Sequence, residues 1–457
     1  MRILMLGWEF PPFIAGGLGV ACFGLTKALD KAGHKVIFIL PKPVEGSTTS
    51  HVRMLAPRAA RLPAGGGVPA MADLIDDAGM PLFGFQHATF HGVPASFSSP
   101  YPSFDPVQYV RLTGAPLTTP STASPSFTSP DLPPAPTGFI GTGGGPGVGY
   151  GMDLVGDSER YARLVVAMAA RESFDVIHAH DWLTYPAGIA LAKVTGKPLV
   201  VQVHSTEFDR AGNNVNARVF DIERAGMLAA DRVIAVSQMT KSICVRKYGV
   251  APDHVDVVYN GVEREATQPA PGTRIESTDK IVLFLGRITM QKGPEYFIAA
   301  AKRVLEKVQD VKFVLAGSGD MALRMIELAA GMGIGHKVLF TGFLRGRDVD
   351  RVFRMADCYV MPSVSEPFGI AALEAISHDV PVILSKTSGA SEVLTHVLKV
   401  DFWDIDEMAN KIIAVLRHPP LSQTLRQHGA MDLHRLTWDG AAERCVMSYQ
   451  KAVAQRT

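Results

Sequence analysis

The sequence predicts an α/β protein with two domains, each built on a doubly wound parallel sheet. At 457 residues the chain is long enough for two domains of ordinary size. Short apolar runs alternate with segments of helical periodicity through both halves, which favours parallel sheets joined by right-handed crossovers. Between the halves, residues 263–280 are polar and contain proline, as expected of a linker. We therefore expect a first domain over residues 1–262 and a second over residues 263–437.

The composition indicates a globular protein and argues against several classes of partner. Hydrophobic residues make up 47% of the chain and charged residues 19%. A net charge of +1 offers no attraction to nucleic acid or to a membrane surface. No apolar run approaches the roughly 18 residues of a membrane helix, and no signal-peptide core opens the sequence, so we expect a cytoplasmic protein. Four scattered cysteines without a CxxC pair predict free buried thiols: Cys22, Cys244, Cys358 and Cys445.

The first domain is expected to open with a strand, a glycine-rich turn and a helix. Residues 2–7 form an apolar run typical of a buried parallel strand. Apolar side chains then recur at helical spacing over residues 18–33, and residues 36–40 read as the next strand. The turn between them, Gly-Gly-Leu-Gly at residues 16–19, lies where a backbone can approach a ligand closely. Close packing of the helix on the strand is the alternative explanation of these glycines.

The stretch from about residue 86 to residue 152 differs in composition from its surroundings. Proline, serine, threonine and glycine dominate residues 93–147. Such a tract cannot bury a core of its own, so we expect a long surface insertion.

Two later strands of the first domain are expected to end in histidines. The strand at residues 174–180 ends at His180 and is followed by Asp181, and the strand at residues 199–203 is followed by His204. Ligands of open α/β sheets bind outside the carboxyl ends of the strands, which places these side chains well. A structural histidine is the alternative for each. The domain's remaining elements are expected at residues 157–168 (helix), 231–236 and 255–258 (strands).

The second domain is expected to begin with a strand that is followed by two cationic residues. The strand at residues 280–286 leads to Arg287 and Lys292, which flank a turn before a helix that starts at Pro294. A guanidinium binds a diphosphate through two hydrogen bonds, and an ammonium binds it as a point charge. A solvated basic loop is the alternative. Further strands are expected at residues 311–316, 337–343 and 380–385, and an amphipathic helix is expected at residues 438–457.

Residues 357–376 are expected to combine a strand, a turn that carries a carboxylate and a helix. The strand at residues 357–362 leads to a polar turn with Glu366, and the helix begins near Gly369. Free amide groups and the dipole at a helix N-terminus favour negative charge. Glu374 lies on the helix, so the two carboxylates approach one crevice from different heights. An ordinary helix start with a solvated glutamate is the alternative.

Four motifs together resemble those of retaining glycosyltransferases with the GT-B fold. They are E-x7-E from Glu366 to Glu374, GR-x4-KG at residues 286–293, HAHDW at residues 178–182 and the GGLG turn at residues 16–19. The chain is most similar to glycogen and starch synthases and to the family 4 transferases, over nearly its whole length outside the insertion. The resemblance implies two Rossmann-like domains that face each other across a cleft, with the last helix packed back on the first domain. It also implies that the insertion serves acceptor choice, for which a loop without function is the alternative.

The resemblance assigns roles to individual residues. Catalytic roles fall to His180, Arg287, Lys292 and Glu366. Donor binding falls to Gly16, Gly17, Arg287, Lys292, Phe343, Leu344, Glu366, Phe368, Gly369, Ile370 and Glu374. The acceptor side is assigned to His204, Glu207 and Asp181, with Asp209 beside Glu207 at the acceptor hydroxyls; a solvated loop is the alternative for Glu207 and Asp209. In these roles the cations stabilise the leaving diphosphate, Glu366 binds sugar hydroxyls and Glu374 binds the ribose. His180 positions the sugar, with His178 packed beneath it.

The implied reaction is transfer of a sugar, glucose in the glycogen synthase-like case, from ADP- or UDP-glucose to an α-glucan. The partners are therefore a nucleotide sugar and a glycosyl acceptor, without nucleic acid or stable membrane insertion. No metal or other cofactor is expected, because cations and helix amides neutralise the leaving group. The Asp-x-Asp pairs at residues 348–350 and 404–406 are expected to open helices instead of binding a metal.

Three other functions stay open at this point. They are a family 4 transferase with a small or lipid-linked acceptor, a phosphorylase of the same fold, and a non-catalytic protein that binds sugar nucleotides. One departure bears on the choice, because Ile14 stands where glycogen synthases carry a lysine, two residues before the first glycine.

Overall fold

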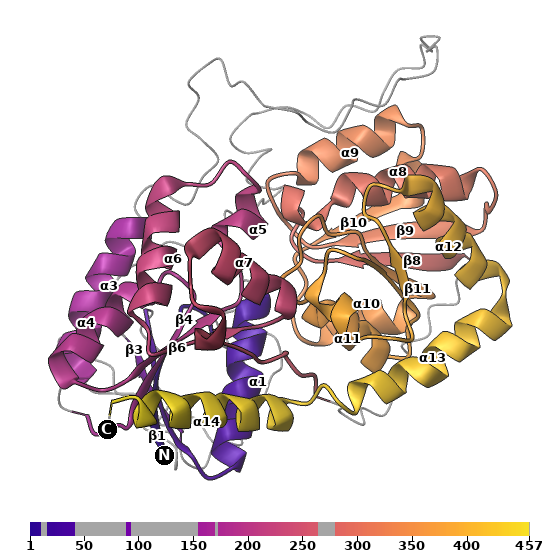
Figure 1. The fold of residues 1–457 in the computed structure, drawn as a ribbon. Coiled ribbons are helices and arrows are strands. Elements are labelled where there is room, and N and C mark those ends of the chain that lie inside the picture. The colour runs from indigo at the N-terminus through magenta and orange to yellow at the C-terminus, as the bar shows by residue number, and fades with distance from the viewer. Residues whose placement is uncertain (11–15, 42–87, 93–153, 170–171, 264–278, 457) are drawn as a thin grey trace, which may run out of the picture.

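The computed structural model describes residues 1–10, 16–41, 88–92, 154–169, 172–263 and 279–456, which form two parallel sheets with helices around them (Figure 1). The first sheet uses strands before residue 263 and the second uses strands after residue 279. The predicted α/β fold with two doubly wound sheets is confirmed. No helix in these ranges is both long and apolar enough to cross a membrane. Ile14 and most of the expected linker, residues 264–278, lie outside the described residues.

The first sheet has all its strands parallel, in the order β3-β2-β1-β4-β5-β6-β7. Its strands are β1 (Arg2–Leu6), β2 (Lys35–Leu40), β3 (Ala88–Gly92), β4 (Val176–His180), β5 (Leu199–Val203), β6 (Arg232–Ala235) and β7 (Val255–Val257). Its helices are α1 (Gly17–Lys31), α3 (Leu154–Ala169), α4 (Tyr185–Thr195), α5 (Glu207–Ala211), α6 (Ala217–Ala229) and α7 (Gln238–Tyr248). Every residue of β4 and β5 is buried, His178, His180 and Gln202 included, as expected of central strands in a parallel sheet that is covered on both faces. The strand order reverses between β1 and β4, which marks the switch point of this sheet.

Strand β3 corrects the expected insertion at residues 86–152. Residues 88–92 pair in parallel with β2 and form the edge of the first sheet. A strand of five residues beside a long tract of proline, glycine and serine gives too little periodic signal to stand out. Residues 93–152 of the expected insertion lie outside the described residues.

The second sheet repeats this arrangement, in the order β10-β9-β8-β11-β12-β13. Its strands are β8 (Lys280–Leu285), β9 (Val311–Ala316), β10 (Val338–Gly342), β11 (Cys358–Met361), β12 (Val382–Ser385) and β13 (Leu398–Val400). Its helices are α8 (Pro294–Leu305), α9 (Ala322–Gly331), α10 (Arg347–Met355), α11 (Ile370–Ser377), α12 (Ile405–Arg417) and α13 (Pro419–Leu433), with a 3₁₀ turn, η3 (Met290–Lys292), before α8. The order reverses between β8 and β11, so the switch point lies at the ends of these two strands.

The last helix, α14 (Trp438–Ala454), follows the second domain and crosses back to pack against α1 of the first (Figure 1). Trp438 fills the space beside Gly24 of α1, where an added Cβ would lie 2.2 Å from the indole ring. The phenol of Tyr449 hydrogen-bonds to Nδ1 of His178 in β4, at 2.8 Å. The end of the chain therefore supports the strand that carries His180.

The two domains touch through residues that follow the carboxyl ends of their strands. Asp209 in α5 accepts a hydrogen bond of 2.6 Å from the Ser365 hydroxyl in the turn after β11. Glu392 of the second domain accepts hydrogen bonds from the backbone amides of Gln238 and Met239 at the start of α7, at 2.9 and 2.7 Å. The two sheets therefore present their ligand-binding ends to each other.

Candidate active site

The switch point of the first sheet brings the glycine turn and the histidine strand to neighbouring positions. Gly16 and Gly17 lie at the start of α1, after β1, and His180 ends the adjacent β4. A Cβ added to either glycine would have no described atom within 4 Å. Close packing therefore does not account for these glycines within the described part of the chain. That these glycines leave room for a ligand next to the helix amides therefore stays a prediction.

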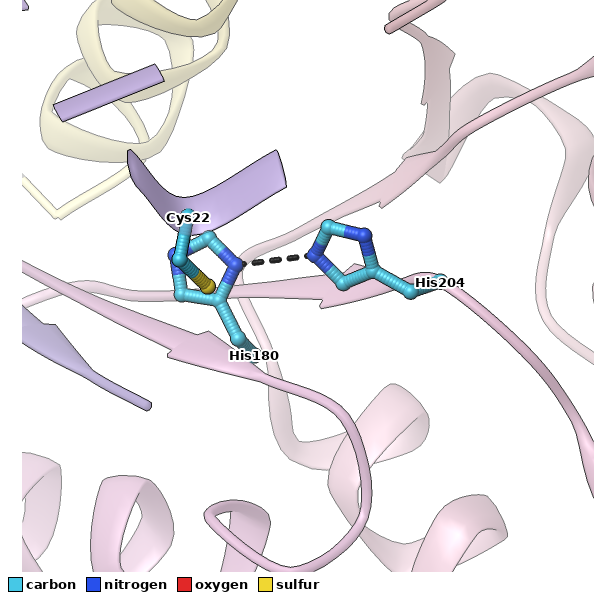
Figure 2. A group of neighbouring side chains, drawn as sticks. All are labelled: Cys22, His180 and His204. Carbon is cyan, nitrogen blue, oxygen red and sulfur yellow. Dashed lines mark hydrogen bonds between the residues drawn. The ribbon is translucent and has the colours of Figure 1, made fainter. Parts of the chain in front are cut away.

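Three imidazoles line the carboxyl end of the first sheet. The rings of His178 and His180 lie 4.1 Å apart, with His178 held from beneath by Tyr449. Nδ1 of His180 lies 2.9 Å from Nε2 of His204 (Figure 2). Burial lowers the pKa of His178 and of His204 to about 3 and that of His180 well below its usual value. All three are neutral at physiological pH, and His204 is the one of them that is partly exposed.

Asp181 holds His204 in place. Its backbone has a φ of 59°, an unusual conformation that aspartate tolerates better than most residues. Its carboxylate accepts hydrogen bonds from the backbone amides of His204, at 2.7 Å, and Ser205, at 3.4 Å. Burial raises the pKa of Asp181 to about 7, against the opposing charge of Arg210. The predicted acceptor-side residue thus acts on the loop that carries His204.

The loop after His204 is ordered by buried charges. The carboxylate of Glu207 pairs with Arg210 at 3.1 Å and accepts a hydrogen bond from the amide of Asn216 at 3.2 Å. The same guanidinium pairs with Glu223 at 2.5 Å. Glu207 is only 3% exposed, so the solvated-loop alternative is wrong. Its side chain supports the loop in this conformation.

The switch point of the second sheet gathers the predicted donor residues. Lys292, in η3 after β8, forms a 2.5 Å ion pair with Glu366, in the turn after β11. The Ser363 hydroxyl donates to the same carboxylate oxygen at 3.1 Å. Arg287 reaches Gln291 of the same turn at 3.4 Å. Because the Glu366 side chain is 8% exposed and that of Lys292 is 20% exposed, this is a structured pair and not the solvated loop that was the alternative.

Gly369 shapes the start of α11 next to this pair. Its φ of 107° is open to glycine and costly for other residues. A Cβ here would lie 2.7 Å from Cε of Met361 and 3.3 Å from Cγ of Glu366. The first amides of α11, from Ile370, have no intrahelical partner and are available to an anion. Phe368 buries its ring in the core, which leaves its backbone at the site.

Replacing Gly369 with alanine should destabilise the protein and displace Glu366. The combination of positive φ and steric overlap should lower the free energy of unfolding by about 1–3 kcal/mol. Equilibrium urea denaturation measures this loss. Gly331→Ala is the matched control, since a Cβ at Gly331 meets no described atom within 4 Å and that residue has no positive φ. The control should change stability by less than about 0.5 kcal/mol, and equal effects of both changes would refute the steric argument.

The remaining predicted donor residues are Glu374, Phe343 and Leu344. Glu374 lies in α11, and burial raises its pKa to about 7. No hydrogen bond to its carboxylate is formed by the described residues, so it is available to a ligand. Phe343 and Leu344 follow β10, separated from β8 by β9. The ring of Phe343 is 44% exposed, and Leu344 packs on the core.

Both Asp-x-Asp pairs open helices, as predicted. Asp348 and Asp350 lie in the first turn of α10. Asp404 caps α12 by accepting a hydrogen bond from the amide of Glu407 at 2.9 Å, and Asp406 follows it in the first turn. Asp348 pairs with Arg351 at 3.0 Å, and Asp350 lies 3.3 Å from Nε2 of His378.

Sequence reasoning missed the contacts that link the two halves of this site. Ser363, Ser365 and Gln291 were given no role, and Asp209 was assigned only to the acceptor side. All four nevertheless tie the Glu366 turn to η3 and to α5. Polar residues beside a motif in each domain were the only signal in the sequence. Their pairing depends on how the domains meet, which periodicity does not reveal.

Three family models match consecutive parts of the chain. "Starch synthase catalytic domain" matches residues 2–104, "Glycosyltransferase Family 4" matches residues 131–266 and "Glycosyl transferases group 1" matches residues 269–431. Together they span both sheets and the switch points described above.

Similar curated proteins are glycosyltransferases. An uncharacterised glycosyltransferase of Methanocaldococcus jannaschii is 27% identical over 99% of this chain and 99% of its own length. The glycogen synthase of Mycobacterium tuberculosis is 26% identical over 86% of this chain and 80% of its own. The D-inositol 3-phosphate glycosyltransferase 1 of Catenulispora acidiphila is 28% identical over 63% of this chain and 74% of its own length.

Solved structures share the fold. Sucrose-phosphate synthase from Thermosynechococcus elongatus matches with a TM-score of 0.69 at 19% identity, over 100% of both chains. The Anabaena protein HepE, in complex with UDP and glucose, matches with a TM-score of 0.65 at 16% identity, over 98% of this chain and 99% of its own. Both sheets, the motifs at their switch points and these relatives agree: the chain has the GT-B fold, and its sequence is similar to glycosyltransferases of the group that includes family 4 transferases and glycogen and starch synthases.

Proposed function

We propose that the protein transfers glucose, with retention of configuration, from a nucleoside diphosphate glucose to an α-glucan. The observation that carries the proposal is the convergence of Lys292, Glu366 and the start of α11 at one switch point. A paired cation and carboxylate next to free helix amides suit a ligand that combines a diphosphate with sugar hydroxyls. The other switch point, with His180, supplies the facing wall.

Charge stabilisation at the leaving group is the main catalytic contribution in this proposal. Breaking the sugar–phosphate bond builds negative charge on the diphosphate oxygens. Arg287, Lys292 and the amides at Gly369 and Ile370 neutralise that charge, which makes a metal unnecessary for the step. Donor binding would draw Lys292 partly away from Glu366 and leave this carboxylate to accept hydrogen bonds from the sugar hydroxyls.

The histidines act on the sugar from the first domain. His180 is fully buried, so donor binding has to uncover it, whereas His204 is already partly exposed. The Asp209–Ser365 hydrogen bond joins the loop after His204 to the turn that carries Glu366. Domain closure of this kind would exclude water and limit hydrolysis of the donor.

Donor binding should depend on pH through Glu374. Because burial raises its pKa to about 7, this carboxyl group is about half protonated near neutral pH. Ribose hydroxyls donate to the ionised form, so donor affinity should rise by up to about tenfold as the pH increases from about 6 to about 8. Calorimetry with UDP-glucose measures this, since its diphosphate diester does not titrate in that range. Glu374→Gln should remove the dependence, and an unchanged slope in the variant would contradict the role.

The same carboxyl group should have the opposite effect on the stability of the ligand-free protein. An unfolded glutamate has a pKa of about 4.3, so the raised native pKa favours folding with the proton bound. That contribution is complete below about pH 4.3 and is lost as the pH rises through about 7. The free energy of unfolding is measured as a function of pH for Glu374→Gln and for Glu407→Gln. Glu407 is an exposed residue of α12 that pairs with Lys411, so its variant shows the general effect of removing a surface carboxylate.

A family 4 transferase with a small acceptor is the second candidate. It is favoured by the relatives named D-inositol 3-phosphate glycosyltransferase, which match 61–64% of this chain at 26–28% identity. Ile14, at the position of the glycogen synthase lysine, points the same way.

A donor and acceptor screen tests the proposal. Purified protein is incubated with ADP-glucose, UDP-glucose or glucose 1-phosphate, with and without glycogen or inositol phosphate, and the release of nucleotide or phosphate is followed. Nucleotide release that depends on glycogen supports the proposal and names the donor. Release only with inositol phosphate or other small acceptors overturns it in favour of the second candidate, and turnover only of glucose 1-phosphate indicates a phosphorylase.

A further inference from the structure

Cys22, His180 and His204 place three potential metal ligands at the carboxyl end of the first sheet. One ligand atom from each residue, the thiol sulfur and two imidazole nitrogens, lies within 4.8 Å of the others. The residues come from α1, from the end of β4 and from the segment after β5. Figure 2 shows the two imidazoles facing each other through ring nitrogens, with the Cys22 side chain beside the His180 ring. Three separate elements of the fold thus converge on one point.

The dimensions suit a small thiophilic cation. Zinc binds imidazole nitrogen at about 2.0–2.1 Å and thiolate sulfur at about 2.3 Å, so two nitrogens of a tetrahedral site lie about 3.3 Å apart. The 2.9 Å between Nδ1 of His180 and Nε2 of His204 needs to widen by only a few tenths of an ångström. A set of one thiolate and two imidazoles binds zinc and cobalt in preference to magnesium and calcium.

His180 is incompletely hydrogen-bonded at the ring nitrogen that does not face His204. Its Nε2 is buried without a hydrogen-bond partner in the described part of the chain, although buried polar atoms are nearly always paired. The Asp181 carboxylate anchors the backbone of His204, the kind of outer support that orients metal-binding side chains. His204 is partly exposed and Cys22 and His180 are buried, so a cation would enter from the His204 side and keep an open position there.

We propose that Cys22, His180 and His204 bind a divalent d-block cation, zinc in particular, through one sulfur and two nitrogens. Binding releases the thiol proton to solvent, so affinity should rise by about tenfold per pH unit. The cation takes no part in the transfer reaction proposed above. An occupied site would instead withhold His180 from the sugar, a consequence that rests on that proposed function, whereas the binding itself does not.

Cobalt titration of the intact protein tests the site without any activity assay. Bound Co²⁺ should give a thiolate-to-cobalt charge-transfer band and the strong visible bands of a tetrahedral centre, saturating at one cobalt per chain and displaced by zinc. Cys22→Ala should abolish the charge-transfer band. His204→Gln, at a partly exposed position, should weaken binding at least about tenfold while the fold is retained.

Cys244→Ala is the matched control, because Cys244 is a second fully buried thiol of the first domain and lies outside the cluster. This variant should keep the full cobalt spectrum, and circular dichroism should show that all variants are folded. A wild-type protein that gives no charge-transfer band, or a band that survives in Cys22→Ala, would overturn the proposal.

Discussion

Replacing Lys292 with alanine is expected to lower turnover by a factor of about 10² or more. In the proposed reaction its ammonium neutralises charge that develops on the leaving diphosphate. The change also leaves the Glu366 carboxylate, which lies 2.5 Å from the ammonium, without its counter-ion near an anionic substrate. Both effects act most strongly in the transition state, so the loss should fall mainly on kcat. Arg287→Ala should cost a similar factor, because it removes the second cation of the same turn.

Steady-state kinetics of nucleotide release, with the donor varied at saturating acceptor, measures these losses. Lys386→Ala is the matched control, since Lys386 lies in the same domain in an exposed ion pair with Asp401. That change should leave kcat within a factor of about two, as expected for a surface pair. Turnover close to that of the wild type in Lys292→Ala or Arg287→Ala would remove the charge-stabilising role from that residue.

The position of this cation site could be predicted from the sequence because it depends on local order. Arg287 and Lys292 follow the apolar strand at residues 280–285, so both cations lie at the carboxyl end of that strand. The strand that precedes Glu366 reads as clearly, and the alternation of strands and helices makes both strands parallel. Strands that run parallel end at the same edge, so the two turns had to lie close together.

The contacts between the domains could not be predicted in this way. Asp209 and Ser365 are 156 residues apart, and Glu392 and Gln238 are 154 residues apart. Each pair joins segments of the two domains whose separation depends on the relative placement of two sheets, and no periodic pattern encodes that placement. Cys22 was missed as a neighbour of His180 for a different reason: both lie in the first domain, but the helical spacing of Cys22 indicates only that it is buried.

Short elements were the other limit. Strands β3 and β13 have five and three residues and lie at the edges of their sheets. An edge strand has one neighbour and less need of a continuous apolar run, so its sequence resembles that of a loop. Glu207 shows the converse, because a charged side chain in a polar segment proved to be buried through its pairing with Arg210.

Replacing Glu366 with glutamine is expected to lower kcat by about 10²-fold while donor affinity is kept or increased. Glutamine retains the shape of the side chain and its contact with the Ser363 hydroxyl, so the turn should hold its conformation. It loses the negative charge that hydrogen-bonds to sugar hydroxyls in the proposed complex. Because Lys292 then carries an uncompensated positive charge, the diphosphate should bind at least as tightly as before.

This split between kcat and affinity distinguishes two roles of the ion pair. If Glu366 served only to hold Lys292 in place, Glu366→Gln would leave turnover nearly intact, and that result would contradict a sugar-binding role. The double variant Lys292→Ala/Glu366→Gln completes the comparison, since two residues that act on one transition state should show losses smaller than the product of the single losses. Glu407→Gln is the control for removal of a carboxylate from the same domain. If the loss of turnover in the double variant equals the product of the two single losses, the cation and the carboxylate act on different steps, although they lie 2.5 Å apart.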